Sequence, residues 1–264
     1  EFNILEGKKF LIERINIVGN SVTNDSVIRS ELLVDEGDPY SALLVNKSIN
    51  RLKGRGIFGT VTHEIIEGSL PDLKVLKISI EEKATGEIMA GAGVGTDGTA
   101  FMFALSENNW LGRGIKVEGG ADISKSKVSG NLSVVNPNYN YTGNVVYSSL
   151  NISSTDAKDT SGYESSKTGF SLGTKFEQYE NVYLSPSIDF SYEDISTDST
   201  ATAAVKKMEG SFTNIDIGYG ISLDRRNQSF QPTDGYRTDF IQTLPLLQDS
   251  SSILTGLSGS IYHA

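Results

Sequence analysis

The sequence contains no cysteine and only two histidines, His63 and His263, which lie far apart in the chain. Without cysteine, neither a disulfide framework nor a thiolate metal site can form. Two distant histidines leave zinc sites and Ser-His-Asp triads poorly supplied. The sequence pattern contains no nucleophile–base pair either, so we predict a protein that is not an enzyme and uses no catalytic residue, metal or cofactor.

Positive charge is also scarce. The 264 residues include 23 lysines and arginines against 33 aspartates and glutamates, which gives a formal net charge of −10. Sequence-independent nucleic-acid binding needs a basic surface, so we expect no nucleic-acid partner. Long apolar runs are missing too, because none approaches the ~18 residues of a membrane-spanning helix. A membrane β-barrel stays possible, since its strands alternate apolar and polar residues.

Two glycine-rich stretches invite a phosphate-binding interpretation, and both fail on their flanks. Residues 54–59, GRGIFG, match the G-x-G-x-x-G pattern. A predicted helix precedes them and a predicted strand follows, which is the reverse of the dinucleotide-binding order. Residues 91–95, GAGVG, have no helix after them. We interpret the first stretch as a helix end and the second as part of a strand.

Residues 9–86 have the predicted order β-α-α-β-β. Strands are expected at 9–18, 58–67 and 73–82. One helix is expected from Thr23 or Asn24 through Leu33, and a second from Ser41 to Gly54 or Gly56. About 75 residues of this kind can bury one thin core between two helices and a three-stranded sheet.

From residue 87 onward, helical periodicity disappears and alternating strands take over. The turn Thr96-Asp97-Gly98 joins predicted strands at 87–95 and 99–107, because Asp-Gly between alternating apolar residues favours a hairpin. Eight further alternating stretches approach the ~9–11 residues that cross a bilayer at a tilt. They are residues 113–124, 127–135, 143–153, 167–176, 181–194, 213–223, 236–244 and 253–262.

The connections and faces of these strands favour a membrane barrel over a soluble sandwich. Polar insertions at 154–166 and 193–207 are expected as long loops on one side, and 224–235 as a long turn on the other. Polar faces rich in serine, glycine and asparagine suit a wet lumen, and aromatic residues near strand ends suit membrane interfaces. A soluble β-sandwich shows the same alternation, so the pattern alone leaves both folds open.

Several motifs then resemble known families. In the first part these are IERINIVGN (12–20), VIRSELLVDEGDPYS (27–41), NRLKGRGIFGTV (50–61) and a strand ending in EEK (81–83), which resemble a POTRA domain. In the second they are TGEIMAGAGVGTDG (85–98), ENNWLGRG (107–114), VVNPNY (134–139) and LDRRNQSFQPTDGYR (223–237). This second set is similar to the BamA-type outer-membrane assembly factors.

The resemblance implies a domain order and a fragment. Residues 1–8 would end a preceding POTRA domain, 9–86 would form an α+β POTRA domain, and 87–264 would form part of an antiparallel transmembrane β-barrel. The family has sixteen strands, of which about ten would be present. The closing strand and an Arg-Gly-Phe/Tyr loop motif would lie beyond Ala264.

The resemblance also implies a function: ATP-independent insertion of β-barrel proteins into the outer membrane, with the POTRA domain in the periplasm. Expected partners are nascent outer-membrane proteins, assembly-machine lipoproteins and outer-membrane lipid. Two alternatives remain open. One is a two-partner-secretion or autotransporter-assembly translocator of the same architecture, and the other is a soluble β-rich binding or adhesin domain.

Two strand edges are the predicted sites, because an unpaired edge can template an incoming strand. The first is the leading barrel strand: Glu87, Ile88, Met89, Ala90, Gly91, Ala92, Gly93, Val94 and Gly95. The second is a POTRA strand: Thr60, Val61, Thr62, His63, Glu64, Ile65, Ile66 and Glu67. The alternative interpretation of the second, which the sequence slightly favours, is an ordinary solvated edge.

The glycines of the leading strand have two interpretations. Each glycine lowers strand stability by about 0.5–1 kcal/mol relative to alanine, which suits a seam that opens and pairs again. Equally, Gly91, Gly93 and Gly95 could make room at a crowded, curved barrel wall.

Overall fold

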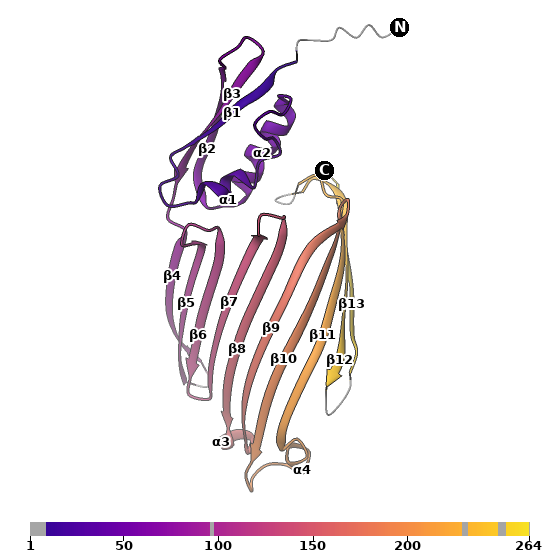
Figure 1. Ribbon diagram of the computed structural model, residues 1–264. Coiled ribbons are helices and arrows are strands. Elements are labelled where there is room, and N and C mark those ends of the chain that lie inside the picture. Colours follow the sequence, from indigo (N-terminus) through magenta and orange to yellow (C-terminus); the bar gives the residue numbers. More distant parts are fainter. Residues whose placement is uncertain (1–8, 96–97, 229–231, 248–251, 264) are drawn as a thin grey trace. The chain divides into compact units, whose positions relative to one another are not determined.

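The computed structural model describes residues 9–95, 98–228, 232–247 and 252–263 (Figure 1). The expected end of a preceding domain in residues 1–8, the turn residues 96 and 97, and part of the 224–235 turn lie outside the described residues. The chain divides into two compact units. One contains Glu1–Gly86 with Glu107–Ile115, and the other contains Glu87–Ser106 with Lys116–Ala264.

The first unit has the predicted β-α-α-β-β order. Its elements are β1 (Leu11–Val18), α1 (Asp25–Arg29), α2 (Ala42–Gly54), β2 (Phe58–Glu67) and β3 (Leu73–Glu82). The sheet order is β1-β3-β2, with β1 parallel and β2 antiparallel to the central β3. The expected fold of this module is therefore confirmed.

Helix α1 is shorter than predicted, since it ends at Arg29 rather than Leu33. The cause is a contact with the second helix. Ser48 of α2 is fully buried, and its hydroxyl accepts a hydrogen bond from the Leu33 backbone N–H at 2.8 Å. Before Leu33, Glu31 and Leu32 donate to the Ile28 and Arg29 carbonyls at 3.1 and 3.0 Å, the tighter spacing of a helix end, and Val34 then lies in the core.

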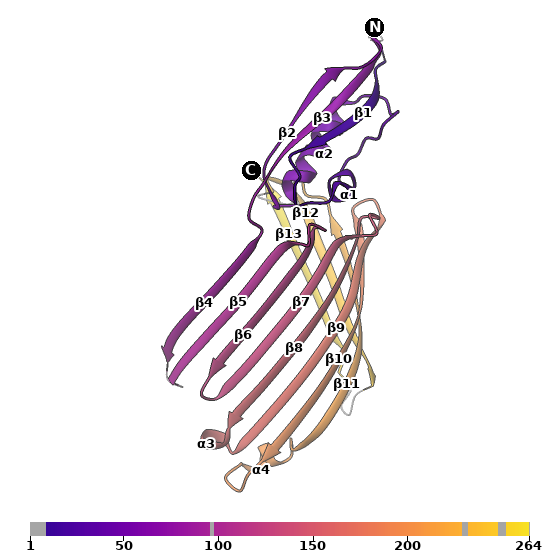
Figure 2. The ribbon, with the colours of Figure 1, turned by 60° about the vertical axis from the view of Figure 1, so that its left-hand side comes forward.

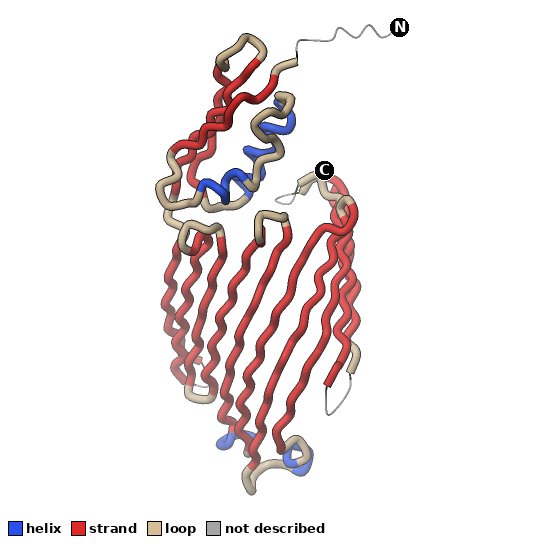
Figure 3. Tube along the Cα trace, in the orientation of Figure 1, coloured by secondary structure: helices blue, strands red, loops and turns tan. Residues whose placement is uncertain are grey.

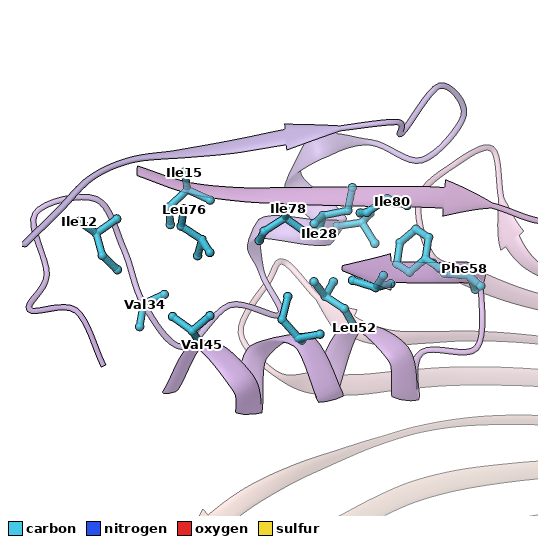
Figure 4. Close-up of a cluster of buried hydrophobic side chains, with 14 residues drawn as sticks. Ile12, Ile15, Ile28, Val34, Val45, Leu52, Phe58, Leu76, Ile78 and Ile80 are labelled. Carbon is cyan, nitrogen blue, oxygen red and sulfur yellow. The ribbon is translucent and has the colours of Figure 1, made fainter. Parts of the chain in front are cut away.

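The core of this unit lies between the helices and the sheet (Figure 4). Helix α2 begins after Ser41, whose hydroxyl accepts from the Leu44 N–H at 3.4 Å, as its capping position predicts. The helix then buries Val45, Ile49 and Leu52, which share one face at helical spacing. The strands supply Ile12, Ile15, Leu76, Ile78 and Ile80.

The second unit is a ten-stranded sheet in which neighbours in sequence are neighbours in space. Figures 1 and 2 show that it curls, with β4 at one end and β13 at the other. Its strands are β4 (Gly86–Gly95), β5 (Gly98–Trp110), β6 (Ile115–Ser124), β7 (Lys127–Tyr139), β8 (Asn144–Ala157), β9 (Tyr163–Tyr179), β10 (Val182–Thr197), β11 (Gly210–Asp224), β12 (Asp234–Leu247) and β13 (Leu254–His263).

The strand register separates an apolar face from a polar face. One row of cross-strand partners runs through Leu132, Leu150, Phe170, Phe190 and Ile215. The adjacent row, one residue away along each strand, runs through Asn131, Asn151, Gly169, Ser191 and Asn214. Because directly opposite residues point to the same side, each row lies on one face of the sheet.

The apolar face is uncovered. Ile152 is 52% exposed and Phe190 is 40% exposed, and Ala201 is the one buried apolar residue of this unit within the described ranges. A soluble sandwich would bury one face of each sheet against the other. This sheet has no such layer among its described residues, so its apolar face is suited to lipid and the sandwich interpretation is not supported. None of the helices in the described residues is both long and apolar enough to cross a membrane.

The strands extend into both long loops predicted at 154–166 and 193–207, taking most of the first and residues 193–197 of the second. β8 runs to Ala157 and β9 begins at Tyr163, while β10 runs to Thr197 and β11 begins at Gly210. The short helices α3 (Lys158–Ser161) and α4 (Ala203–Lys206) lie in the remaining connections, at the same end of the sheet (Figure 3). Polar residues continue the pairing, because backbone hydrogen bonds need no apolar side chain.

Candidate functional site

All nine residues of the predicted leading strand lie on β4, at one edge of the ten-stranded sheet. The strand is exposed along almost its whole length, with Ile88 81% and Val94 86% accessible. An edge strand presents backbone N–H and C=O groups that have no partner on their outer side. The geometry therefore allows an extended segment to add to β4 by backbone hydrogen bonding.

The first unit also has two edge strands, and β1 is largely covered. Ile12 exchanges backbone hydrogen bonds with residues 37 and 38, at 2.7 and 2.9 Å. Ile15 donates its N–H to Glu36 Oε1 at 3.0 Å and accepts from Arg29 Nη2 at 3.1 Å. The outward polar groups of these two residues are thus satisfied within the unit.

The edge strand β2 carries all eight residues of the second predicted site, and within residues 9–86 no comparable segment pairs with its outer side. Val61 is buried and Ile65 half-buried, while the other six predicted residues are exposed. A hollow of about 430 Å³ lies beside it, lined by Lys53 of α2 and by residues 58–62. Of the two edges of this unit, β2 is the one suited to strand addition.

A cluster that our sequence analysis did not predict joins three segments of the first unit. The turn between β5 and β6 belongs to this unit. Buried Asn109 donates to the Thr23 hydroxyl at 2.8 Å and accepts from the Gly114 N–H at 2.7 Å. The Gly112 carbonyl accepts from the Asn24 N–H at 2.9 Å. We call residues 109–114 the anchor turn.

Two glycines let the anchor turn approach this closely. Gly112 has φ +69°, and a Cβ there would lie 2.0 Å from the Val22 carbonyl oxygen. Gly114 has φ +63°, and a Cβ there would lie 2.4 Å from Arg55 Nη2. The positive φ favours glycine at both positions, and at Gly112 the backbone clash with Val22 excludes a side chain as well. The glycines of ENNWLGRG were the available sequence signal, but the neighbouring sequence does not indicate which residues the turn contacts.

Charged side chains hold both the anchor turn and the loop of residues 21–24 that contacts it. Arg55 donates to the Gly114 carbonyl at 2.9 Å and lies 3.7 Å from Glu31, whose side chain is 10% exposed. Burial lowers the pKa of Arg55, and the Glu31 carboxylate opposes that shift. The stretch that resembled a dinucleotide motif thus supplies a structural arginine.

Glu82 binds the same loop from β3. Its carboxylate accepts the backbone N–H groups of Ser21, Val22 and Thr23 at 2.9, 2.9 and 2.6 Å, together with the Ser21 hydroxyl at 2.8 Å. Partial burial would raise the pKa of Glu82, but these hydrogen bonds outweigh it and lower the pKa to about 2. The group therefore stays ionised at neutral pH and fixes the loop.

Comparison with known proteins decides the family. Residues 109–264 match the family model described as the Omp85 superfamily domain. The chain belongs to the Omp85 superfamily. Residues 10–83 match the POTRA model, whose description is surface antigen variable number repeat. The predicted module and the predicted family are confirmed in this Omp85 chain, which places it in the outer membrane with its POTRA domain in the periplasm.

Curated relatives of the Omp85 chain include outer membrane protein assembly factors BamA. That of Neorickettsia risticii is 25% identical over 246 residues, which cover 90% of this chain and 32% of the relative. That of Neisseria meningitidis serogroup B is 31% identical over 143 residues, covering 53% of this chain and 18% of the relative. The chain thus spans about a third or less of the length of these relatives.

Solved structures show the same fold. BamA from Haemophilus ducreyi lacking POTRA domains 1–3 has a TM-score of 0.72 at 21% identity, over 97% of this chain and 52% of that chain. CdiB from Acinetobacter baumannii has a TM-score of 0.59 at 11% identity, over 96% and 48%. The expected POTRA and barrel architecture is confirmed by the first match, and among the described residues of this Omp85 chain β4 and β13 remain the two unpaired ends of the sheet.

Proposed function

We propose that this Omp85 chain is part of a non-enzymatic factor that assembles β-barrel proteins into the outer membrane without ATP. The observation that supports it is β4: an exposed strand at the edge of a sheet whose apolar face suits lipid. The assembly factors named among its relatives agree with this class of function. The proposed clients are nascent outer-membrane proteins.

The physical basis is the cost of unpaired backbone groups. In hydrocarbon, each unsatisfied N–H or C=O costs several kcal/mol, so both an open edge and an unpaired client strand are unfavourable there. Pairing a client strand with β4 satisfies the outward groups of β4 and those on the facing side of the client strand. Gly91 and Gly93 weaken the strand that must release the product, because glycine lowers strand stability by about 0.5–1 kcal/mol per residue.

Cysteine crosslinking in the intact protein tests this proposal. Ala90→Cys or Ala92→Cys on β4 should form disulfides with a cysteine series along one strand of a stalled client. Ile152→Cys on β8 is the matched control, since that residue is exposed on the apolar face of a strand paired on both sides. Absence of any client adduct on β4, or equal adducts on β8, would refute the proposal.

The edge of β2 is the proposed second docking strand, for clients or for partner lipoproteins in the periplasm. Its support is the free outer side described above and the neighbouring hollow. Thr62→Cys should crosslink a partner, whereas Arg14→Cys on β1, also exposed, should not. Equal labelling of the two positions would mean that β2 is an ordinary solvated edge.

The translocator alternative keeps less support. The CdiB fold matches less closely than that of BamA, at TM-scores of 0.59 and 0.72. Reconstitution distinguishes the two functions, because an insertase leaves its client as a barrel in the bilayer and a translocator releases it on the far side.

A further inference from the structure

The polar face of the sheet changes character at its first hairpin. A Cβ placed on Gly91 would lie 3.7 Å from the terminal methyl carbon of Met102, so these two residues point to the same side. Side chains alternate along each strand, so Met89 and Gly93 on β4, with Ala100 on β5, share that side. Where β7 and β8 carry asparagine and serine, β4 and β5 carry methionine, alanine and glycine.

A hollow of about 430 Å³ occupies this side of the hairpin. Its apolar part is lined by Gly91, Ala92, Gly93, Ala100, Phe101, Met102 and Ile123. The polar residues that line it are Asp122, Ser124, Lys127 and Ser129. A Cβ on Gly93 would meet no atom within 4 Å, so the glycines leave the hollow open toward the free edge of β4.

We propose that this hollow receives an aromatic side chain, with tyrosine preferred, from a strand that pairs with β4. The inference rests on the proposed function, because strand pairing is what delivers the side chain. A strand added to β4 turns alternate side chains to the hollow's side, about 5 Å from the opposing residue. Opposite Gly91 or Gly93, that side chain meets no β4 side chain in its way.

The residues that line the hollow favour an aromatic side chain over an aliphatic one. Aromatic residues cover cross-strand glycines, and a methionine sulfur makes favourable contacts with a ring. A phenolic hydroxyl adds a polar tip, and Asp122 and Lys127 at the polar part of the hollow offer an acceptor and a donor. Phenylalanine matches the apolar part alone, and alanine leaves the hollow empty.

The test uses the intact protein with Ala90→Cys and a stalled client. The cysteine series first fixes which client residue lies opposite Gly91 and Gly93. Tyrosine, phenylalanine and alanine are then compared at that position. We expect the crosslink yield at limiting client to fall about fivefold from tyrosine to alanine, the effect of one cross-strand aromatic contact.

Filling the hollow from the protein side supplies the second measurement. Gly93→Leu should abolish the preference for tyrosine, while Val94→Leu, on the opposite side of the same strand and outside the lining of the hollow, should preserve it. Gly93 has open space and no positive φ, so the variant should keep a heat-modifiable barrel, which gel mobility checks. Equal yields for tyrosine and alanine, or a preference that survives Gly93→Leu, overturn the inference and leave the proposed function standing. If no client adduct forms with any side chain, the proposed function fails and this inference fails with it.

Discussion

Replacing Glu82 with glutamine should loosen the loop that receives the anchor turn. The carboxylate accepts three backbone N–H groups and one hydroxyl from residues 21–23. Glutamine has nearly the same shape, but it is neutral and turns an NH₂ donor toward groups that are themselves donors. The variant therefore removes the charge and half of the acceptor capacity without opening a cavity.

The magnitude follows from the pKa. A carboxyl group with an ordinary value of 4.5 that is lowered to about 2 gains about 3 kcal/mol from the folded environment. Glu82 is only partly buried, so screening by solvent reduces this to about 1–2 kcal/mol. Local opening of residues 21–23 should then be about 5–30 times more frequent in the variant.

The assay is amide hydrogen exchange in the intact protein, followed at residues 21–23. Glu81→Gln is the matched control, because Glu81 is the exposed neighbour on the same strand. Since the folded pKa is lowered, the stabilisation is fully present above pH 4.5 and is lost as pH falls through about 2. After correction for intrinsic exchange rates, protection should decrease across that window in the native protein and stay flat in Glu82→Gln.

Two results would refute the reasoning. Equal exchange in the glutamine variant and the native protein would mean that the carboxylate adds nothing beyond its shape. Equal losses in Glu81→Gln and Glu82→Gln would mean that the effect is general electrostatics rather than these hydrogen bonds.

Three further substitutions test the anchor turn and the edge. Gly112→Ala should destabilise residues 19–24 by more than about 2 kcal/mol, because it combines a positive φ with a backbone clash. The control Gly143→Ala, at a position with a positive φ and open space, should destabilise its own turn by about 1 kcal/mol. Amide exchange rates at each site check this, and equal costs would exclude the clash. Asn109→Ala should cost about 2 kcal/mol, since it leaves the buried Gly114 N–H without its acceptor and the Thr23 hydroxyl without the donor that Asn109 supplies, and unchanged protection of the turn would contradict that. Replacing both Gly91 and Gly93 with valine should slow client insertion severalfold while the barrel stays heat-modifiable, and an unchanged rate would remove the weak-edge argument in favour of simple space at the wall.

Strand positions were predictable where the alternation of apolar and polar residues extends over the whole strand. β2 and β3 begin and end at the predicted residues 58, 67, 73 and 82, because alternating residues there face a core. The end of α1 was not predictable, since it depends on the buried hydroxyl of Ser48 from another helix. The lengths of β8 to β11 were underestimated, because strands that leave the apolar belt continue pairing with polar residues that read as loops.

The same contrast applies to the site. The sequence predicted β4 as an edge strand, because it is the first strand of a meander. In the structure β4 lies at one edge of the sheet. The anchor turn could not be found from the sequence, because Asn109 and Thr23 are 86 residues apart and each sits in an unremarkable polar stretch. Contacts of this kind carry no local period, so only the folded chain brings them together.

The uneven distribution of buried residues has a consequence for how the protein itself is made. The POTRA unit has its own apolar core and can fold in water as soon as it reaches the periplasm. The sheet has almost no buried apolar residue among those described, so water offers it no driving force to collapse into this form. We therefore expect the POTRA unit to fold before the sheet does, and the sheet to form only where its apolar face meets lipid.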